Sequence, residues 1–365
     1  MNRQTVELPN RQKVGRRIVG LLSAAVGILL FVYAVHRAGF GEVARGVART
    51  GWGFAIVLLL SGLRLTARSL AWIQCLETGI KDQGSGARRS EGSGTDNLRE
   101  HVGRGLKPGA ALRAILVGEA LGNVTPLGLF ISEPAKATFV HETVPISSGL
   151  PALAVENIFY SVSVALVIGA GMLVLLGQFD VPAFVRLGSL GALAFVAVVL
   201  GTAALVMTGR WRPARGVMRL VLRTSSEPWI ERIGGLEDRI YGFARAHPGR
   251  IPAIAALELG FHVAGVAEAY VVLSWLGVSV TLVTAFVLES VNRVINVLFR
   301  FVPLRLGVDE AGSGLLTQVL GLGAPTGVTL AIIRKARVLA WSAVGILLLA
   351  QRAIHFKSSK WKSSN

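Results

Sequence analysis

The sequence predicts an all-α polytopic membrane protein with about six full transmembrane helices and two re-entrant helical hairpins in an inverted repeat. Three observations lead to this prediction. The 365 residues are 52% hydrophobic, and several apolar runs reach the roughly 20 residues needed to cross a bilayer core. Two further apolar stretches are broken by proline and glycine in the same order. Hydrocarbon tolerates a broken helix only where protein or a water-filled cavity surrounds it.

The candidate spans are apolar runs without the proline and glycine breaks, and their order along the chain defines two membrane halves. The interrupted segments lie at 111–142 and 281–323, one in each half. Residues 36–51 form a short amphipathic stretch, which we expect to lie in the plane of the lipid headgroups. The six candidate spans are 18–35, 52–76, 147–177, 184–208, 251–277 and 326–351.

Basic residues gather beside the ends of the spans, and the positive-inside rule then places both termini in the cytoplasm. The net charge of +17 is therefore expected to face the cytoplasmic side of the cell membrane, and no nucleic-acid partner is predicted. The resulting organisation is a basic N-terminus (1–17), a first membrane half (18–208) with a flexible loop (77–110), a basic connector (209–250), a second membrane half (251–351) and a basic tail (352–365).

The two interrupted segments repeat one motif, in which a glutamate lies seven residues beyond a proline. After two full spans the first segment is entered from the cytoplasm, whereas the second, after the fifth span, is entered from outside. Similar motifs entered from opposite sides predict two hairpins related by a pseudo-two-fold axis in the membrane plane, with a transport site where they meet. The predicted hairpin turns are at Pro126 and Gly128, and at Pro303 and Gly307.

The apolar segment before Pro303 carries a polar stripe that begins at Glu289 and continues at i+3, i+4, i+7 and i+11. Such a stripe in a membrane helix indicates that it faces a wet or charged interior. Alternatively, Glu289 and Arg293 satisfy each other one turn apart, but that leaves Asn296 and Arg300 unexplained.

The first half repeats this polar pattern more weakly. Glu119 and Asn123 share a helix face, and Glu133 and Lys136 follow the break. As an alternative, the acids after each break cap the returning helices, because the N-terminus of a helix favours negative charge. The predicted substrate path contains Glu119, Asn123, Glu133, Lys136, Glu289, Asn292, Arg293, Asn296, Arg300 and Glu310.

Other ionisable residues lie in or near the spans. Glu156 lies 23 residues past Glu133, and Arg334 and Arg337 lie 24 and 27 residues past Glu310. Glu156 paired with Arg334 or Arg337 is therefore a hypothesis for a link between the halves; the alternative is that each group finds a partner within its own half.

Glu258 and His262 lie one turn apart in the fifth span. The histidine is either a packing residue or one step of a proton relay, because imidazole titrates near neutral pH.

The chain shows no catalytic motif that would make it an enzyme. It has no phosphate-binding glycine loop with its lysine and no Gly-x-Ser-x-Gly nucleophile turn. We therefore expect no catalytic residues, no metal and no cofactor.

At its hairpin motifs the chain resembles the transmembrane region of lysylphosphatidylglycerol synthases, which belong to the flippase-like integral membrane proteins. The resemblance covers about residues 16–351 and is strongest in three stretches. It departs from the family where Asn157 replaces the usual arginine and where Leu304-Arg305 replace preferred glycines. The three stretches are Asn123 to Gly128 with Glu133 and Lys136, Val155-Glu156-Asn157, and Phe301 to Gly312.

The resemblance implies translocation of a polar-headed lipid, anionic or aminoacylated or glycosylated, between bilayer leaflets. It implies membrane lipids as partners. No fused aminoacyl transferase domain is expected in this chain, and the sequence leaves open whether a separate lipid-modifying enzyme is a further partner. The sequence leaves open a secondary transporter of a small solute and a non-transporting accessory protein. It does not indicate an oligomeric state.

Overall fold

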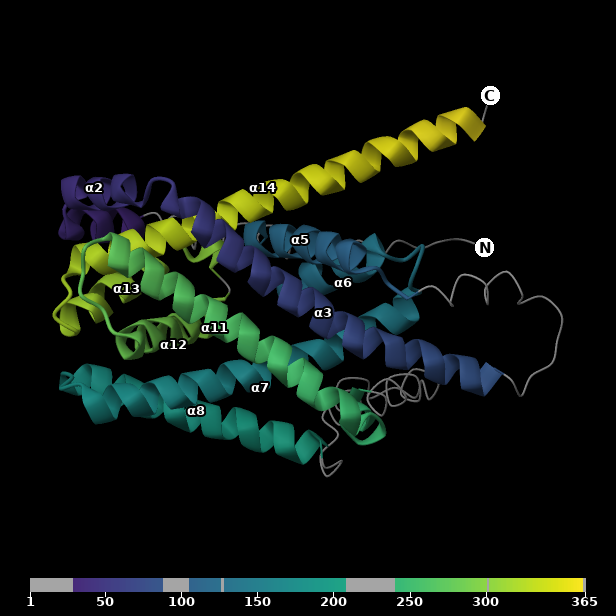
Figure 1. Ribbon diagram of the computed structural model, residues 1–365, viewed down its shortest axis with the longest axis horizontal. Coiled ribbons are helices and arrows are strands. Elements are labelled where there is room, and N and C mark those ends of the chain that lie inside the picture. The colour runs from purple at the N-terminus through teal and green to yellow at the C-terminus, as the bar shows by residue number, and fades with distance from the viewer. Residues whose placement is uncertain (1–28, 88–104, 126–127, 208–239, 301, 364–365) are drawn as a thin grey trace, which may run out of the picture.

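The computed structural model describes residues 29–87, 105–125, 128–207, 240–300 and 302–363, and the structural statements below refer to these residues. Every regular element in this part of the chain is a helix, and the helices pack side by side in an elongated bundle (Figure 1). The predicted all-α class is confirmed. By length and composition, four helices are able to cross a membrane: Gly53–Leu76, Ile146–Gln178, Ala183–Leu205 and Pro248–Trp275.

The four spanning stretches belong to α3 (Gly53–Ala87), α7 (Ile146–Gln178), α8 (Ala183–Met207) and α11 (Ile251–Trp275), the last preceded by the short helix η1 (Pro248–Arg250). Each agrees closely with a predicted span. Helix α3 continues to Ala87, however, so the beginning of the predicted loop 77–110 is helical rather than flexible. Apart from the stretches 77–87 and 105–110, that loop lies outside the described residues.

The first and last predicted spans differ from the other four. Only Leu29–Ala38 of the first is described, as a short apolar helix. It is followed by the amphipathic α2 (Phe40–Thr50), whose Val43 is buried while Phe40 is exposed. The last, α14 (Ala324–Ser363), has 40 residues and a length of about 60 Å. It is not among the four helices above and carries Arg334, Lys335 and Arg337 near its start.

Each interrupted segment is a pair of short helices joined by a break. The first pair is α5 (Pro108–Val124) and α6 (Leu129–Phe139), and the second is α12 (Leu282–Leu298) and α13 (Val308–Val319), with the short helix η2 (Pro303–Arg305) between them. The first hairpin lies between the end of α3 and the start of α7. The second lies between the end of α11 and the start of α14, at the opposite end of the bundle (Figure 1).

The first break depends on a glycine. A Cβ on Gly128 would lie 1.8 Å from the carbonyl oxygen of Gly122, so only a residue without a side chain fits this backbone contact. Pro126 lies outside the described residues. In the second break Gly307 has a φ of 80°, which favours glycine.

The spans of each half pack against the hairpin of the other half. Helix α7 contacts α12, α14 contacts α5, and α3 contacts α11 at the centre. The contact of α7 with α12 and that of α14 with α5, which we call the crossed contacts, are both close at a glycine. Gly171 meets Ser290, and Gly345 meets the backbone of Leu116. Small residues allow membrane helices to approach in this way. A two-fold axis between the halves would exchange these contacts, so the arrangement fits the inverted repeat, which stays a prediction.

Candidate functional site

The centre of the bundle holds a buried cluster of arginines around two glutamates. Glu289 on α12 is 1% exposed. Its carboxylate accepts hydrogen bonds from Nη2 of Arg293 at 2.5 Å and from Nη2 of Arg334 at 2.6 Å. Arg64 on α3 lies 3.7 Å from the same carboxylate. One acid therefore joins three guanidinium groups from three helices.

Glu268 on α11 is the second carboxylate of this cluster. It accepts hydrogen bonds from Arg64 at 3.3 Å and from Arg337 on α14. The ring of Phe261 lies beneath Arg64 and Arg293, with the guanidinium carbons 4.6 and 4.9 Å from its centroid, where cations are attracted to the ring face. Within the described part of the chain, four arginines share two carboxylates, and the cluster has an excess of two positive charges.

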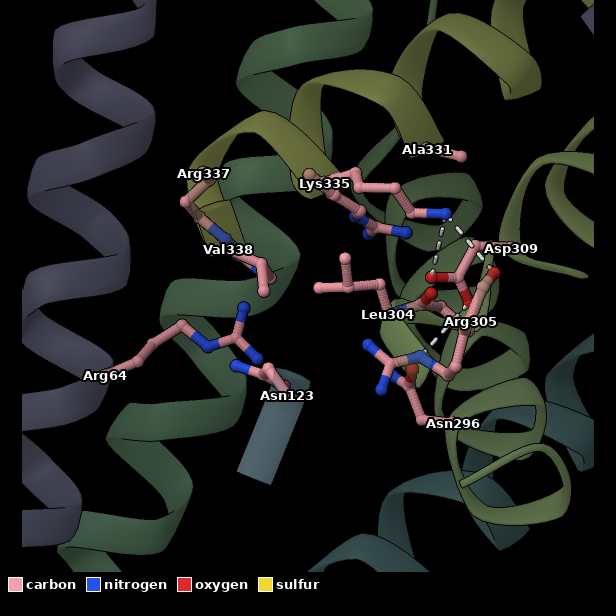
Figure 2. A pocket seen from close by; sticks show the side chains of 12 residues that line it. Arg64, Asn123, Asn296, Leu304, Arg305, Asp309, Ala331, Lys335, Arg337 and Val338 are labelled. Atoms are coloured by element: carbon pink, nitrogen blue, oxygen red, sulfur yellow. Dashed lines mark hydrogen bonds and ion pairs between the residues drawn. The ribbon is translucent and has the colours of Figure 1, made fainter. Parts of the chain in front are cut away.

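A small polar cavity of about 40 Å³ lies beside this cluster. That is well below the roughly 150 Å³ of a cavity that binds benzene. In Figure 2, Arg64 and Asn123 lie on one side of the cavity and Asn296 and Arg305 lie on the other, with Leu304 between them. Both hairpins contribute to the wall, together with α3 and α14. Its charged residues are five basic side chains and one acid: Arg64, Arg305, Arg334, Lys335, Arg337 and Asp309.

The second break supplies one side of the cavity through a strained turn. Leu304 and Arg305 have φ values of 51° and 47°, a left-handed conformation that is costly for residues with a side chain. The turn is held by Lys335, which donates to the Arg305 carbonyl at 3.2 Å and to the Glu310 carboxylate at 2.6 Å. Glu310 in turn accepts from the Gly307 backbone at 2.8 Å. Strain of this kind is characteristic of functional sites.

The first half has its own charge cluster, of opposite balance. Arg68 on α3 binds both carboxylate oxygens of Glu156, at 2.8 and 2.9 Å, and lies 3.4 Å from Glu119. The buried Lys136 donates to Glu119 at 3.2 Å and to Glu133 at 2.8 Å. Three carboxylates therefore share two cations among the side chains described here.

The comparison with known proteins agrees with this architecture. Residues 20–353 match the sequence profile of the lysylphosphatidylglycerol synthase transmembrane region. The chain belongs to this family. No curated protein and no solved structure matches it. The family is a membrane region linked to lipid handling, and the match contains no transferase domain.

One predicted pairing is wrong. Glu156 does not contact Arg334 or Arg337; it pairs with Arg68. Arg334 pairs with Glu289, and Arg337 pairs with Glu268. The reason is geometric: α3 packs against α7 and brings Arg68 to Glu156. The alternative of a partner within the same half is correct for all three.

The polar stripe in this family member has two roles. Glu289 and Arg293 form the buried pair one turn apart, whereas Asn292 and Asn296 line the cavity. The Oδ1 atom of Asn296 is buried without a hydrogen-bond partner among the described residues. Arg300 is exposed, and its charge acts on Glu119 across the gap between the hairpins.

The alternative that the acids after each break cap the returning helices is correct for the second hairpin but not for the first. Glu310 caps the start of α13 through Gly307. Glu133 instead lies inside α6, paired with Lys136. Asn123 reaches Ser342 on α14 at 3.5 Å, which is a long contact between the first hairpin and the last helix.

Several residues at the centre were not part of the predicted path. Most of them could have been found from the sequence as charges inside apolar helices, because such charges are rare and face the bundle interior. Tyr160 gave no such signal, although its ring lies under Arg68 and its hydroxyl accepts from Arg293 at 3.4 Å, so it joins the two clusters. The charged residues outside the predicted path are Arg64, Arg68, Glu268, Arg305, Asp309 and Lys335.

Proposed function

We propose that this protein moves a lipid with a phosphate-bearing headgroup between the leaflets of the cell membrane, with both termini in the cytoplasm. The observation that carries the proposal is the excess of two positive charges around Glu268 and Glu289, beside a cavity with five basic side chains. Buried charge is costly unless it is paired, so an anion bound there would be stabilised. Guanidinium groups bind phosphate through two parallel hydrogen bonds.

The cavity must open for a headgroup to enter. At about 40 Å³ it is smaller than the roughly 150 Å³ cavity that binds benzene, and a phosphodiester with its substituent is larger than benzene. The opening we propose is a separation of the two hairpins, because Asn123 of the first and Asn296 of the second face each other across the cavity (Figure 2). The acyl chains would stay in lipid while the headgroup crosses between the hairpins. A lipid-modifying enzyme that supplies the substrate is the expected partner.

The proposal is tested with the purified chain reconstituted into liposomes. The vesicles carry trace lipids labelled on the headgroup: phosphatidylglycerol, its lysyl form, and a glycolipid without phosphate. A membrane-impermeant quencher then reports how much label reaches the outer leaflet. We expect loss of label beyond that of empty liposomes for the phosphate-bearing lipids and not for the glycolipid. No loss for any lipid would refute the proposal.

Arg305→Gln is expected to slow translocation about tenfold or more. A hydrogen bond to a charged group contributes about 1.5–3 kcal/mol, and 1.4 kcal/mol corresponds to a factor of ten. The variant should still fold, because Arg305 is about a quarter exposed and Asp309 remains near Lys335.

The matched control is Arg186→Gln, which removes an exposed arginine from α8. It should translocate at the rate of the unmodified protein. Equal rates for Arg305→Gln and Arg186→Gln would show that the cavity arginine does not contact the headgroup.

A further inference from the structure

Ser163, Glu258 and His262 form a third polar group, whose side chains make no ion pair with either charge cluster in the described structure. Ser163 on α7 faces Glu258 and His262 on α11. Its Oγ lies 3.3 Å from Oε2 of Glu258 and 3.0 Å from Nε2 of His262. Both side chains on α11 are buried, at 3% and 4% exposure. Oε1 of Glu258 and Nδ1 of His262 have no hydrogen-bond partner in the described structure.

Counting hydrogens assigns the protons in this group. The Ser163 hydroxyl also lies 2.8 Å from the backbone carbonyl of Tyr160, its shortest contact. A hydroxyl has one hydrogen to donate and two lone pairs to accept. The Tyr160 carbonyl and an ionised Glu258 would both need this one hydrogen, and the carbonyl is the nearer of the two, at 2.8 Å against 3.3 Å, so we assign the hydrogen of Ser163 to Tyr160. The other two neighbours must then donate to Ser163, which requires a hydrogen on Nε2 of His262 and a proton on Glu258.

The surroundings of Glu258 agree with a neutral carboxylic acid. No lysine, arginine or histidine nitrogen in the described regions lies within ion-pair distance of it, unlike the other buried acids in the bundle. An isolated carboxylate buried away from water takes up a proton rather than remain charged. The groups that face it are Arg68 and Cys75 from α3, Glu156 and Tyr160 from α7, His262 on its own helix, and Arg293 from α12.

We propose that Glu258 is a proton-binding site, and that release of its proton is coupled to the movement of the hairpins. On release, the proton leaves Oε2 of Glu258 for a water molecule that enters the site, and the hydroxyl of Ser163 turns from Tyr160 to the new carboxylate. The new negative charge then attracts Arg68 and Arg293, the two arginines that Tyr160 joins. Movement of Arg68 away from Glu156, or of Arg293 away from Glu289, would weaken the charge cluster to which that arginine belongs. The coupling rests on the proposed lipid translocation, whereas the proton site does not.

The proton site is tested without any transport assay. Infrared difference spectra of the purified protein in water and heavy water at neutral pH report the carbonyl stretch of a protonated carboxylic acid. We expect this band in the unmodified protein, its loss in Glu258→Gln, and a changed frequency in Ser163→Ala, which removes the bonded hydroxyl. Glu142→Gln, which alters an exposed acid, should leave the band unchanged. Identical spectra for the unmodified protein, Glu258→Gln and Ser163→Ala would overturn the assignment.

The coupling is tested in the liposome assay with and without a pH difference across the membrane. Translocation by the unmodified protein should depend on the gradient, and translocation by Glu258→Gln should not, because its amide imitates the protonated acid permanently. Equal dependence in both proteins would overturn the coupling. A carboxylic acid band without any translocation would support the proton site and refute the proposed function.

Discussion

Glu289→Gln is expected to destabilise the protein by about 3–5 kcal/mol, which is the usual cost of removing one partner from a buried ion pair. The carboxylate of Glu289 is the shared acceptor of Arg293 and Arg334 and lies close to Arg64. Without its charge, four buried arginines would be left with Glu268 alone. Thermal unfolding in detergent, followed by size-exclusion chromatography of heated samples, measures the expected fall in the midpoint.

Two further variants separate a charge effect from a general loss of packing. Combining Glu289→Gln with Arg334→Gln removes one charge of each sign. The double variant should therefore lose less stability than the sum of the losses in the two single variants. Contacting residues typically show coupling energies of about 0.5–3 kcal/mol. Glu142→Gln removes an acid from an exposed pair with Arg352 and should change the midpoint little. An unaltered midpoint in Glu289→Gln would contradict a buried charge cluster.

The order and type of the helices were predictable because each depends on local composition. Runs of about 20 apolar residues mark α3, α7, α8 and α11, and proline with glycine marks both hairpin breaks. The continuation of α3 to Ala87 was not predictable, because its Gly/Ser-rich end has the composition of a loop. The span predicted at 326–351 falls within α14.

The partners of the charged residues could not be predicted in the same way. A charge in an apolar helix indicates that the residue faces the interior, but its partner depends on how the helices cross. Arg68 and Glu156 are 88 positions apart, and only the packing of α3 against α7 brings them together. The pair Glu289–Arg293 was predictable because both residues lie on one helix, one turn apart.

Gly345→Leu is expected to destabilise the contact between α14 and the first hairpin by about 1–3 kcal/mol, the usual cost of overpacking. A Cβ at position 345 would lie 2.3 Å from the carbonyl oxygen of Leu116 and 2.7 Å from the Cβ of Ala120. A backbone carbonyl within a helix cannot move aside as a flexible side chain can, so α14 and α5 must separate. The midpoint of thermal unfolding should fall.

The control for this variant lies on α8, where a Cβ on the exposed Gly188 would meet nothing within 4 Å. Gly188→Leu makes the same chemical change and should be neutral or slightly stabilising, because leucine favours a helix over glycine by somewhat less than about 1 kcal/mol. If the halves are related by a two-fold axis, Gly171→Leu should resemble Gly345→Leu, since its Cβ would lie 2.1 Å from that of Ser290. Equal midpoints for Gly345→Leu and Gly188→Leu would mean that α14 and α5 do not touch in the folded protein, and the crossed packing on which the repeat depends would be wrong.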